Sequence, residues 1–191
     1  MTVASFVFSA VALALSGAAF GWQVLAWFLT GGRANVDLRI GVIDKLSQRF
    51  FTLPLGPKAI DGIKRTATQN GINGPVAFFV TVSNVGRTAL TVKDIAFRAP
   101  TNERYGILGG GDWGDKLPKR LEPGDSTTCV YDLSFLQNMA ALQCHKHKLS
   151  LAPMFAEAEL GTGKTVRCKK QALVTPVIEQ SSSNKDEMEN E

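Results

Sequence analysis

The sequence predicts a mainly β protein in which an N-terminal transmembrane helix precedes an antiparallel β-sandwich with one short helix. Two observations support this fold class. Residues 3–29 contain no charged side chain, which is typical of a membrane span. The remainder holds six or seven short strand-like stretches separated by turn residues, a pattern that favours a sandwich over a barrel. We therefore divide the chain into an anchor helix (1–32), a β-sandwich domain (33–177) and a disordered acidic tail (178–191).

The apolar N-terminal segment is long enough to cross a membrane. As a helix it would span about 40 Å, which exceeds the hydrocarbon layer of about 30 Å. Trp22 and Trp27 lie near its end, at the level that amphipathic rings prefer, and Gly31 and Gly32 supply a helix stop. A cleaved signal peptide is the alternative, but it requires a basic start and an apolar run of about 7 to 15 residues. The segment has neither, so we expect an uncleaved, single-pass signal-anchor in the cell membrane.

The charges that flank the anchor predict its orientation. No lysine or arginine precedes the span, whereas Arg33, Arg39, Lys45 and Arg49 follow it closely. The positive-inside rule then places the N-terminus outside and the domain in the cytoplasm, with an extracytoplasmic domain as the alternative. The three cysteines cannot form a fully paired framework, which agrees with a reducing compartment, although one bridge remains possible.

The formal charge of +4 is unevenly distributed. Residues 33–178 hold 20 of the 21 basic side chains and 12 of the 17 acidic ones. A domain this basic beside a bilayer would be attracted to anionic lipid headgroups, by about 1 kcal/mol for each lysine or arginine near the surface. The alternative is a surface of mixed charge that keeps the domain soluble. We expect the bilayer, and no nucleic acid, as a partner.

Gly17 and Gly21 form a pair of small residues one helical turn apart within the anchor, and Ala10 and Ala14 extend the same pattern upstream. Such a pair lets a second helix approach closely, and in lipid this packing drives association. Small residues are also common in membrane helices, so the pattern can be incidental. We take Gly17 and Gly21 as candidate partner-binding residues, for a homo-oligomer or for another protein.

Alternation and turn chemistry place the strands of the domain. The clearest pair is a predicted hairpin of residues 75–83 and 88–97, joined by the turn Asn84-Val85-Gly86-Arg87. One soluble helix is expected over residues 134–143, with Ser134 as its N-cap. Residues 54–74 are expected to form a long loop. The other predicted strands are 36–40, 126–133, 148–160 and 165–174.

Two runs of residues carry a resemblance to a known family. They are Val80-x-Val82-x-Asn84-x-Gly86-Arg87-x-Ala89-x-Thr91-Val92 and, downstream, Leu121-Glu122-Pro123-Gly124-Asp125-Ser126. The pattern resembles bacterial immunoglobulin-like β-sandwich modules, in which an Asn-x-Gly hairpin joins two core strands and a Pro-Gly turn precedes another. The whole layout is similar to small single-pass bacterial membrane proteins with such a domain. The resemblance implies an immunoglobulin-like fold and no particular reaction.

The segment Gly161-Thr162-Gly163-Lys164-Thr165 resembles the end of a phosphate-binding loop. That loop requires G-x-x-x-x-G-K-[ST] between a strand and a helix. The first glycine would fall on Ala158, and the residues that follow have strand character. We therefore interpret the segment as a hairpin turn.

Cys144, His145 and His147 are weak candidates for a metal site. On a strand the two histidines would point to the same face and could hold a zinc or copper ion. A structural zinc site needs four ligands, and the chain has no other histidine. Neither histidine has a carboxylate close in sequence to complete a catalytic triad. We expect no metal, no cofactor and no catalytic residue.

Residues 109–115 form a glycine-rich segment that carries Asp112, Trp113 and Asp115. Two carboxylates and an aromatic ring could bind a cation, a sugar or a protein, although many loop tips have this composition. These three residues are our candidates for partner binding in the domain. Together the features predict a membrane-tethered, non-enzymatic binding or assembly module, an accessory subunit of a membrane complex. A hydrolase or metal-dependent enzyme whose residues converge only in the fold is the alternative.

Overall fold

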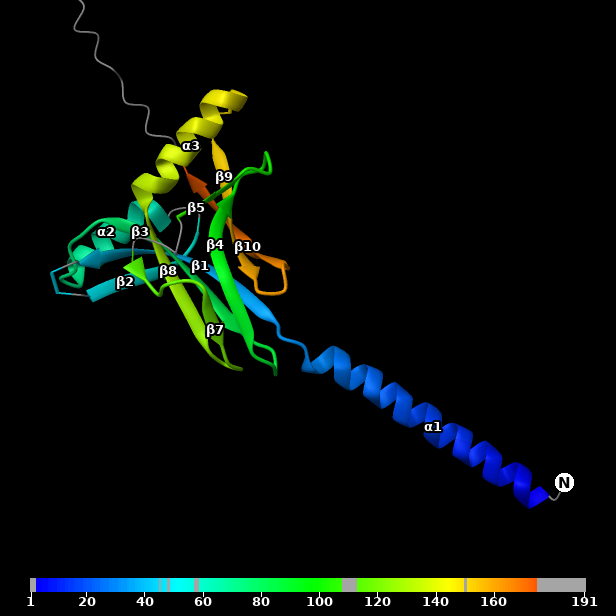
Figure 1. Ribbon diagram of the computed structural model, residues 1–191. Helices are drawn as coiled ribbons and strands as arrows, with labels where there is room; N and C mark the ends of the chain where they lie inside the picture. The colour runs from blue at the N-terminus through cyan, green and yellow to red at the C-terminus, as the bar shows by residue number, and fades with distance from the viewer. Residues whose placement is uncertain are drawn as a thin grey trace, which may run out of the picture.

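Helix α1 (Val3–Thr30) leads into a domain of two antiparallel β-sheets that pack face to face (Figure 1). The computed structural model describes residues 3–44, 46–47, 49–56, 59–107, 113–149 and 151–174. The first sheet has the strand order β2-β1-β3-β8-β6. The second has the order β10-β9-β4-β5, with β7 paired to the start of β4. The prediction of a mainly β fold behind a long apolar helix is confirmed.

The elements of the domain follow one another in a simple order. They are β1 (Ala34–Asp44), β2 (Arg49–Pro54), α2 (Ala59–Gln69), β3 (Val76–Asn84), β4 (Leu90–Arg98), β5 (Arg104–Gly106), β6 (Trp113–Gly114), β7 (Lys119–Leu121), β8 (Ser126–Asp132), α3 (Leu133–His147), β9 (Ala152–Leu160) and β10 (Thr165–Val174).

Strand β1 shows how alternation separates the core from the outer surface. Val36, Leu38 and Ile40 are buried in the core, whereas Asp37 and Arg39 lie on the opposite face of the strand. In β8, Cys129 and Tyr131 share one face and are fully buried. Apolar side chains from both sheets therefore meet in one core.

Aromatic contacts join the two sheets at the centre of this core. The ring of Phe97 on β4 meets the ring of Phe78 on β3 and that of Tyr131 on β8, with centroids 6.4 and 5.1 Å apart, both edge to face. The Tyr131 hydroxyl donates a 2.7 Å hydrogen bond to the carbonyl of Ile95. A buried phenol needs such a partner, so this bond lets Tyr131 fill the core without leaving a polar atom unsatisfied.

The predicted hairpin between residues 75–83 and 88–97 is wrong. Both segments are strands, but β3 pairs with β1 and β8 in the first sheet, and β4 pairs with β9, β5 and β7 in the second. The turn from Asn84 to Arg87 therefore carries the chain across the sandwich. Turn residues permit a sharp reversal of the chain. They do not decide whether the two strands then form hydrogen bonds in one sheet or pack against each other in two sheets. The hairpin predicted for residues 148–160 and 165–174 is present as β9 and β10.

The long loop predicted for residues 54–74 is also wrong. Strand β2 forms a hairpin with β1 and ends at Pro54, and helix α2 follows it. Ile63 and Ala67, one turn apart on α2, are buried, and so is Ile72 beyond the helix. Ile60, Ile63 and Ala67 do recur at helical spacing, but the segment is short, and the Gly, Pro and Lys residues around it favour a loop by composition.

Helix α3 is longer than predicted and begins differently. It runs from Leu133 to His147, and Asp132 caps it by accepting a 2.9 Å hydrogen bond from the backbone N–H of Ser134. The predicted cap, Ser134, lies inside the first turn. At the other end Lys148 adopts a left-handed conformation with φ of 53°, which ends the helix as a C-cap does.

Helix α1 stands clear of the domain. The stretch from Ser5 to Ala26 is long and apolar enough to cross a membrane, and none of it is buried against the rest of the protein. Figure 1 shows α3 at the end of the domain far from α1. The acidic tail at 178–191 lies outside the described residues.

Candidate functional site

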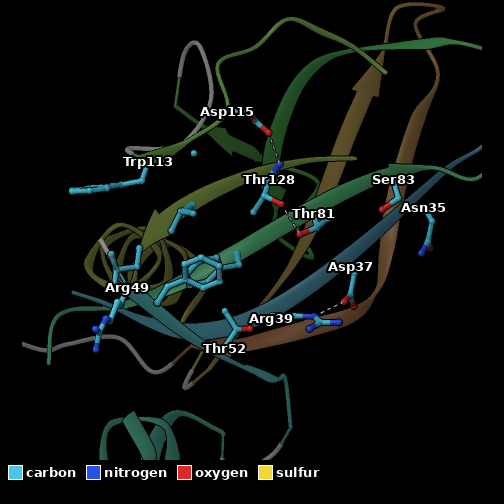
Figure 2. A pocket seen from close by; sticks show the side chains of 15 residues that line it. Asn35, Asp37, Arg39, Arg49, Thr52, Thr81, Ser83, Trp113, Asp115 and Thr128 are labelled. Carbon is cyan, nitrogen blue, oxygen red and sulfur yellow. Dashed lines mark hydrogen bonds and ion pairs between the residues drawn. The ribbon is translucent and has the colours of Figure 1, made fainter. Parts of the chain in front are cut away.

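The outer face of the first sheet is hollowed into an open groove of about 940 Å³ (Figure 2). All five strands of that sheet contribute to its lining. Successive residues of a strand point to opposite faces, so the lining consists of the residues between those that build the core. The alternation that specifies the core therefore specifies the groove as well.

The half of the groove nearer to α1 is polar. Asn35 on β1 lies opposite Ser83 on β3, and in the next row Asp37 lies beside Thr81, which lies beside Thr128 on β8. The hydroxyls of Thr81 and Thr128 are 2.9 Å apart and share a hydrogen bond. This row of small polar groups can accept and donate hydrogen bonds without closing the groove.

The far half of the groove has an apolar floor. Ile43, Ala77, Phe79 and Val130 form a buried cluster that is separate from the main core. The Phe79 ring lies 5.6 Å from the ring of Phe50 on β2, centroid to centroid. These four side chains are already buried, so the apolar surface that a partner would meet here is mainly that of the exposed rings beside them, Phe50 and Trp113.

Gly41 allows the Phe79 ring to form part of the groove floor. A Cβ atom at Gly41 would lie 2.4 Å from Cε2 of Phe79 and 2.6 Å from the carbonyl oxygen of Phe51. Only a residue without a side chain therefore lets the Phe79 ring lie across β1 toward β2. A glycine inside a strand often marks such a close approach.

Two exposed side chains stand at the apolar end of the groove. Trp113 on β6 pairs in register with Val130, and it is 40% exposed. Phe50 on β2, across the sheet, is 64% exposed. Figure 2 shows Trp113 and Arg49 toward one end and Asn35, Asp37 and Ser83 toward the other. A ligand along the groove would thus meet aromatic rings and an arginine at one end, and small polar groups at the other.

Asp37 is held as a carboxylate at the polar end. Its two oxygens contact the Arg39 Nε atom at 3.0 Å and the Lys170 Nζ atom at 2.9 Å. Burial acts to raise the pKa of Asp37, but the hydrogen bonds from Lys170 and Arg39 outweigh it and leave the pKa below its usual value. Lys170 belongs to β10, so this ion pair also joins the two sheets along one side.

Asp115 fixes the short strand β6 against β8. Its carboxylate accepts hydrogen bonds from the Thr127 hydroxyl at 3.0 Å and the Thr128 backbone N–H at 3.1 Å, and it contacts the Lys119 Nζ atom at 3.0 Å. Burial acts to raise the pKa of Asp115, but the bonds from Lys119, Thr128 and Thr127 lower it further than burial raises it. Asp115 therefore positions Trp113, two residues away, at the rim.

The structure brings together two of the three candidate residues from the glycine-rich segment. Trp113 and Asp115 both line the groove, whereas Asp112 lies outside the described residues. The sequence does not point to Phe50 and Phe79 as site residues, because β2 carries no clear strand signal and Phe79 resembles any other apolar residue of a strand. Gly17 and Gly21 lie on α1 with nothing within 4 Å of where a Cβ atom would stand.

Cys144, His145 and His147 lie far from the groove, in the last turns of α3. On a helix, residues two apart point about 200° away from each other, so the two histidines do not share a face as a strand would have allowed. Within the described residues, no group of three or more His, Cys, Asp or Glu side chains is placed to hold a metal ion. The three cysteines are free thiols, and only Cys144 is not buried.

A polar cluster docks this end of α3 onto the domain. Gln143 is buried and accepts a 2.7 Å hydrogen bond from the Thr101 hydroxyl. It donates to Glu103 and to the Tyr105 hydroxyl, and Lys146 pairs with the same Glu103 carboxylate. The hydrogen bonds from Lys146 and then Tyr105 lower the pKa of Glu103 to about 2. The cluster is satisfied internally, which indicates a structural role.

The lowered pKa of Glu103 predicts how acid affects α3. Its pKa in the folded protein lies below the usual 4.5, so its contribution to stability is present above pH 4.5 and is lost as the pH falls toward 2. Glu103→Gln should speed hydrogen exchange of the α3 amides at pH 6, and this difference from the wild type should vanish near pH 2. The amides of β9 and β10 serve as the internal reference. A difference that stays constant from pH 6 to pH 2 would contradict the assignment.

Comparisons of this chain with protein-family models, with curated proteins and with solved structures found no match.

Proposed function

We propose that the protein is a membrane-tethered, non-enzymatic binding or assembly module, an accessory subunit of a membrane complex. In this proposal its partner is an extended segment of another membrane-associated protein, which binds along the groove of the first sheet. The single observation that carries the proposal is the groove itself, with an apolar floor at Phe79 and Val130 and a polar row at Asp37, Thr81 and Thr128.

The dimensions of the groove support a peptide partner. Asn35 and Ile43 both line it and are eight residues apart on one strand, which corresponds to about 27 Å at the rise of a β-strand. A small molecule would fill only part of that length, whereas an extended segment of about eight residues would match it. The aromatic side chains at the rim belong to the residue types that contribute most to protein interfaces.

The lining favours binding over the enzymatic alternative. A hydrolase or metal-dependent enzyme would place a histidine or cysteine beside a carboxylate in the pocket. The groove carries Asp37 and Asp115, but both carboxylates are already bonded to lysine or arginine. Its lining, so far as the structure describes it, contains neither histidine nor cysteine.

We also propose that the sandwich is immunoglobulin-like. That fold has the strand order A-B-E-D in one sheet and C-F-G in the other. Strands β1, β3, β8 and β6 have the sequence ranks and pairing of A, B, E and D, and β4, β9 and β10 have those of C, F and G. Elements β2, β5, β7, α2 and α3 are additions. This correspondence supports the resemblance to small single-pass bacterial membrane proteins, and an experimental structure with β4 paired to β3 would contradict it.

The groove predicts which substitutions disrupt partner binding. A photoreactive residue in place of Ser83, on the groove, should form a discrete adduct in membranes, and one in place of Leu173 should not. Trp113→Ala and Phe50→Ala should each lower the yield of that adduct about tenfold or more, because exposed aromatic anchors dominate interface energies. Leu173→Ala and Leu142→Ala remove exposed apolar side chains elsewhere (46% and 58% exposed) and should have no effect. An adduct of equal yield in all four variants would refute the proposal.

The proposed orientation places the domain in the cytoplasm, as the basic residues after the anchor indicate. Cys144 is the one partly exposed thiol, because Cys129 and Cys168 are buried. A thiol reagent that cannot cross membranes should leave the full chain unmodified in intact cells and modify it after lysis. Cys144→Ser should abolish the labelling seen after lysis. Modification of Cys144 in intact cells would place the domain outside.

Self-association through α1 is part of the same proposal and rests on the open surface around Gly17 and Gly21. Large side chains there would keep two helices apart. Gly17→Ile or Gly21→Ile should therefore reduce dimerisation in a membrane reporter assay, whereas Leu15→Ile should not. If the glycine variants associate as strongly as the wild type, the glycine pair is incidental and any oligomer is held by the domain.

A further inference from the structure

The connection between the anchor and the domain is very short. Helix α1 ends at Thr30 and β1 begins at Ala34, so only residues 31–33 lie between them. Three residues can bridge at most about 10 to 14 Å. If α1 crosses a membrane, the end of the domain at which β1 begins must stay close to the headgroup layer.

The turn between β3 and β4 packs directly on this connection. The backbone N–H of Val85 donates a 2.8 Å hydrogen bond to the carbonyl of Arg33. A Cβ atom at Gly86 would lie 2.4 Å from the backbone nitrogen of Arg33 and 2.6 Å from the carbonyl oxygen of Gly31. Because these neighbours are backbone atoms that cannot move aside, the close fit depends on glycine at position 86.

Asn84 makes the turn rigid. Its side-chain amide is buried and donates to the carbonyls of Thr88 at 2.9 Å and Leu121 at 3.1 Å, and its Oδ1 accepts from the N–H of Gly86 at 3.0 Å. Its backbone exchanges two 2.9 Å hydrogen bonds with Gly124 and Asp125 in the turn before β8. The tip of the turn is therefore held in one position relative to both sheets and to residues 31–33.

The tip itself combines an apolar and a basic side chain. Val85 is 62% exposed, and Arg87 is exposed and makes no ion pair with a described residue. In the neighbouring turn, Glu122 pairs with Arg120 at 3.0 Å, and the Asp125 carboxylate accepts from the N–H of Glu122. An apolar tip flanked by a free arginine suits the boundary of a bilayer, where the side chain of valine enters the interface and the guanidinium meets phosphate.

We infer that the Val85–Arg87 tip is a membrane contact, with Val85 in the interfacial layer and Arg87 on an anionic lipid phosphate. Through Gly86 and Asn84 this contact fixes the tilt of the domain on the bilayer. The polar end of the groove, at Asn35 and Ser83, then lies near the membrane, and the apolar end lies farthest from it. The inference requires that α1 spans the membrane but does not depend on what binds in the groove.

Spin labelling of the full chain in lipid vesicles tests the contact. The background is Cys144→Ser, because the other two native thiols are buried. A nitroxide is attached after Val85→Cys, or after Leu142→Cys as a control that is also exposed but lies on α3. In vesicles with anionic lipid, the label at position 85 should be several-fold less accessible to a water-soluble relaxation agent than the label at position 142. Equal accessibility at the two positions would overturn the inference.

Two further variants separate the parts of the inference. Adding Arg87→Gln should reduce the protection at position 85 in anionic vesicles to the level seen in vesicles of neutral lipid alone. Unchanged protection would remove Arg87 from the contact. Adding Gly86→Val, which disrupts the fit on residues 31–33, should increase the mobility of the label at position 85 and leave the label at position 142 unchanged. An immobile label at position 85 in that variant would show that the turn does not depend on this fit.

Discussion

The hydrogen bonds of Asn84 are the interaction on which the half of the domain next to α1 depends. A buried amide must satisfy every polar atom, because each one left without a partner costs about 1 to 3 kcal/mol. Asn84 does so by closing its own turn and by reaching β7 in the second sheet and the turn before β8 in the first. One residue thus ties both sheets to the segment that leads into α1.

The groove depends on the register that this end of the domain sets. Strand β3 ends at Asn84, and its partner β1 begins opposite it at Ala34. A shift of one residue between them would move the core residues outward and the groove residues inward. The same register also orders the groove, because the polar rows at Asn35 and Asp37 lie nearest α1 and the apolar row at Phe79 and Val130 comes next.

The sequence predicts the positions of most strands, but it does not predict how the strands pair or where the groove lies. Alternation, β-branched and aromatic residues, and the turn residues between segments together place β1, β3, β4, β8, β9 and β10 as strands. The sequence cannot show that the Asn84 turn crosses the sandwich, because strands that pair within one sheet and strands that pack across the two sheets carry the same apolar residues. Helix α2 is missed because its short apolar period, which includes Ile63 and Ala67, lies among Gly, Pro and Lys residues that favour a loop. Trp113 and Asp115 could be proposed from composition, whereas Phe79 becomes part of a site only through its contact over Gly41, which is a tertiary feature.

The two outer faces of the sandwich differ in what they can offer a partner. On the second sheet, the Glu157 carboxylate is 1% exposed and lies 2.7 Å from Arg98 Nε and 3.1 Å from Arg104 Nε, and Arg104 also pairs with Asp94 and Glu159.

A partner that competed for these groups would leave a buried charge without its counterion, which is strongly unfavourable. On the first sheet the exposed rings of Phe50 and Trp113 need no such exchange, since covering them removes apolar surface from water. The outer face of the second sheet, whose charged side chains pair with one another, therefore stabilises the fold. The face that is left open, which includes the strand that continues from α1, is therefore the one we propose for binding.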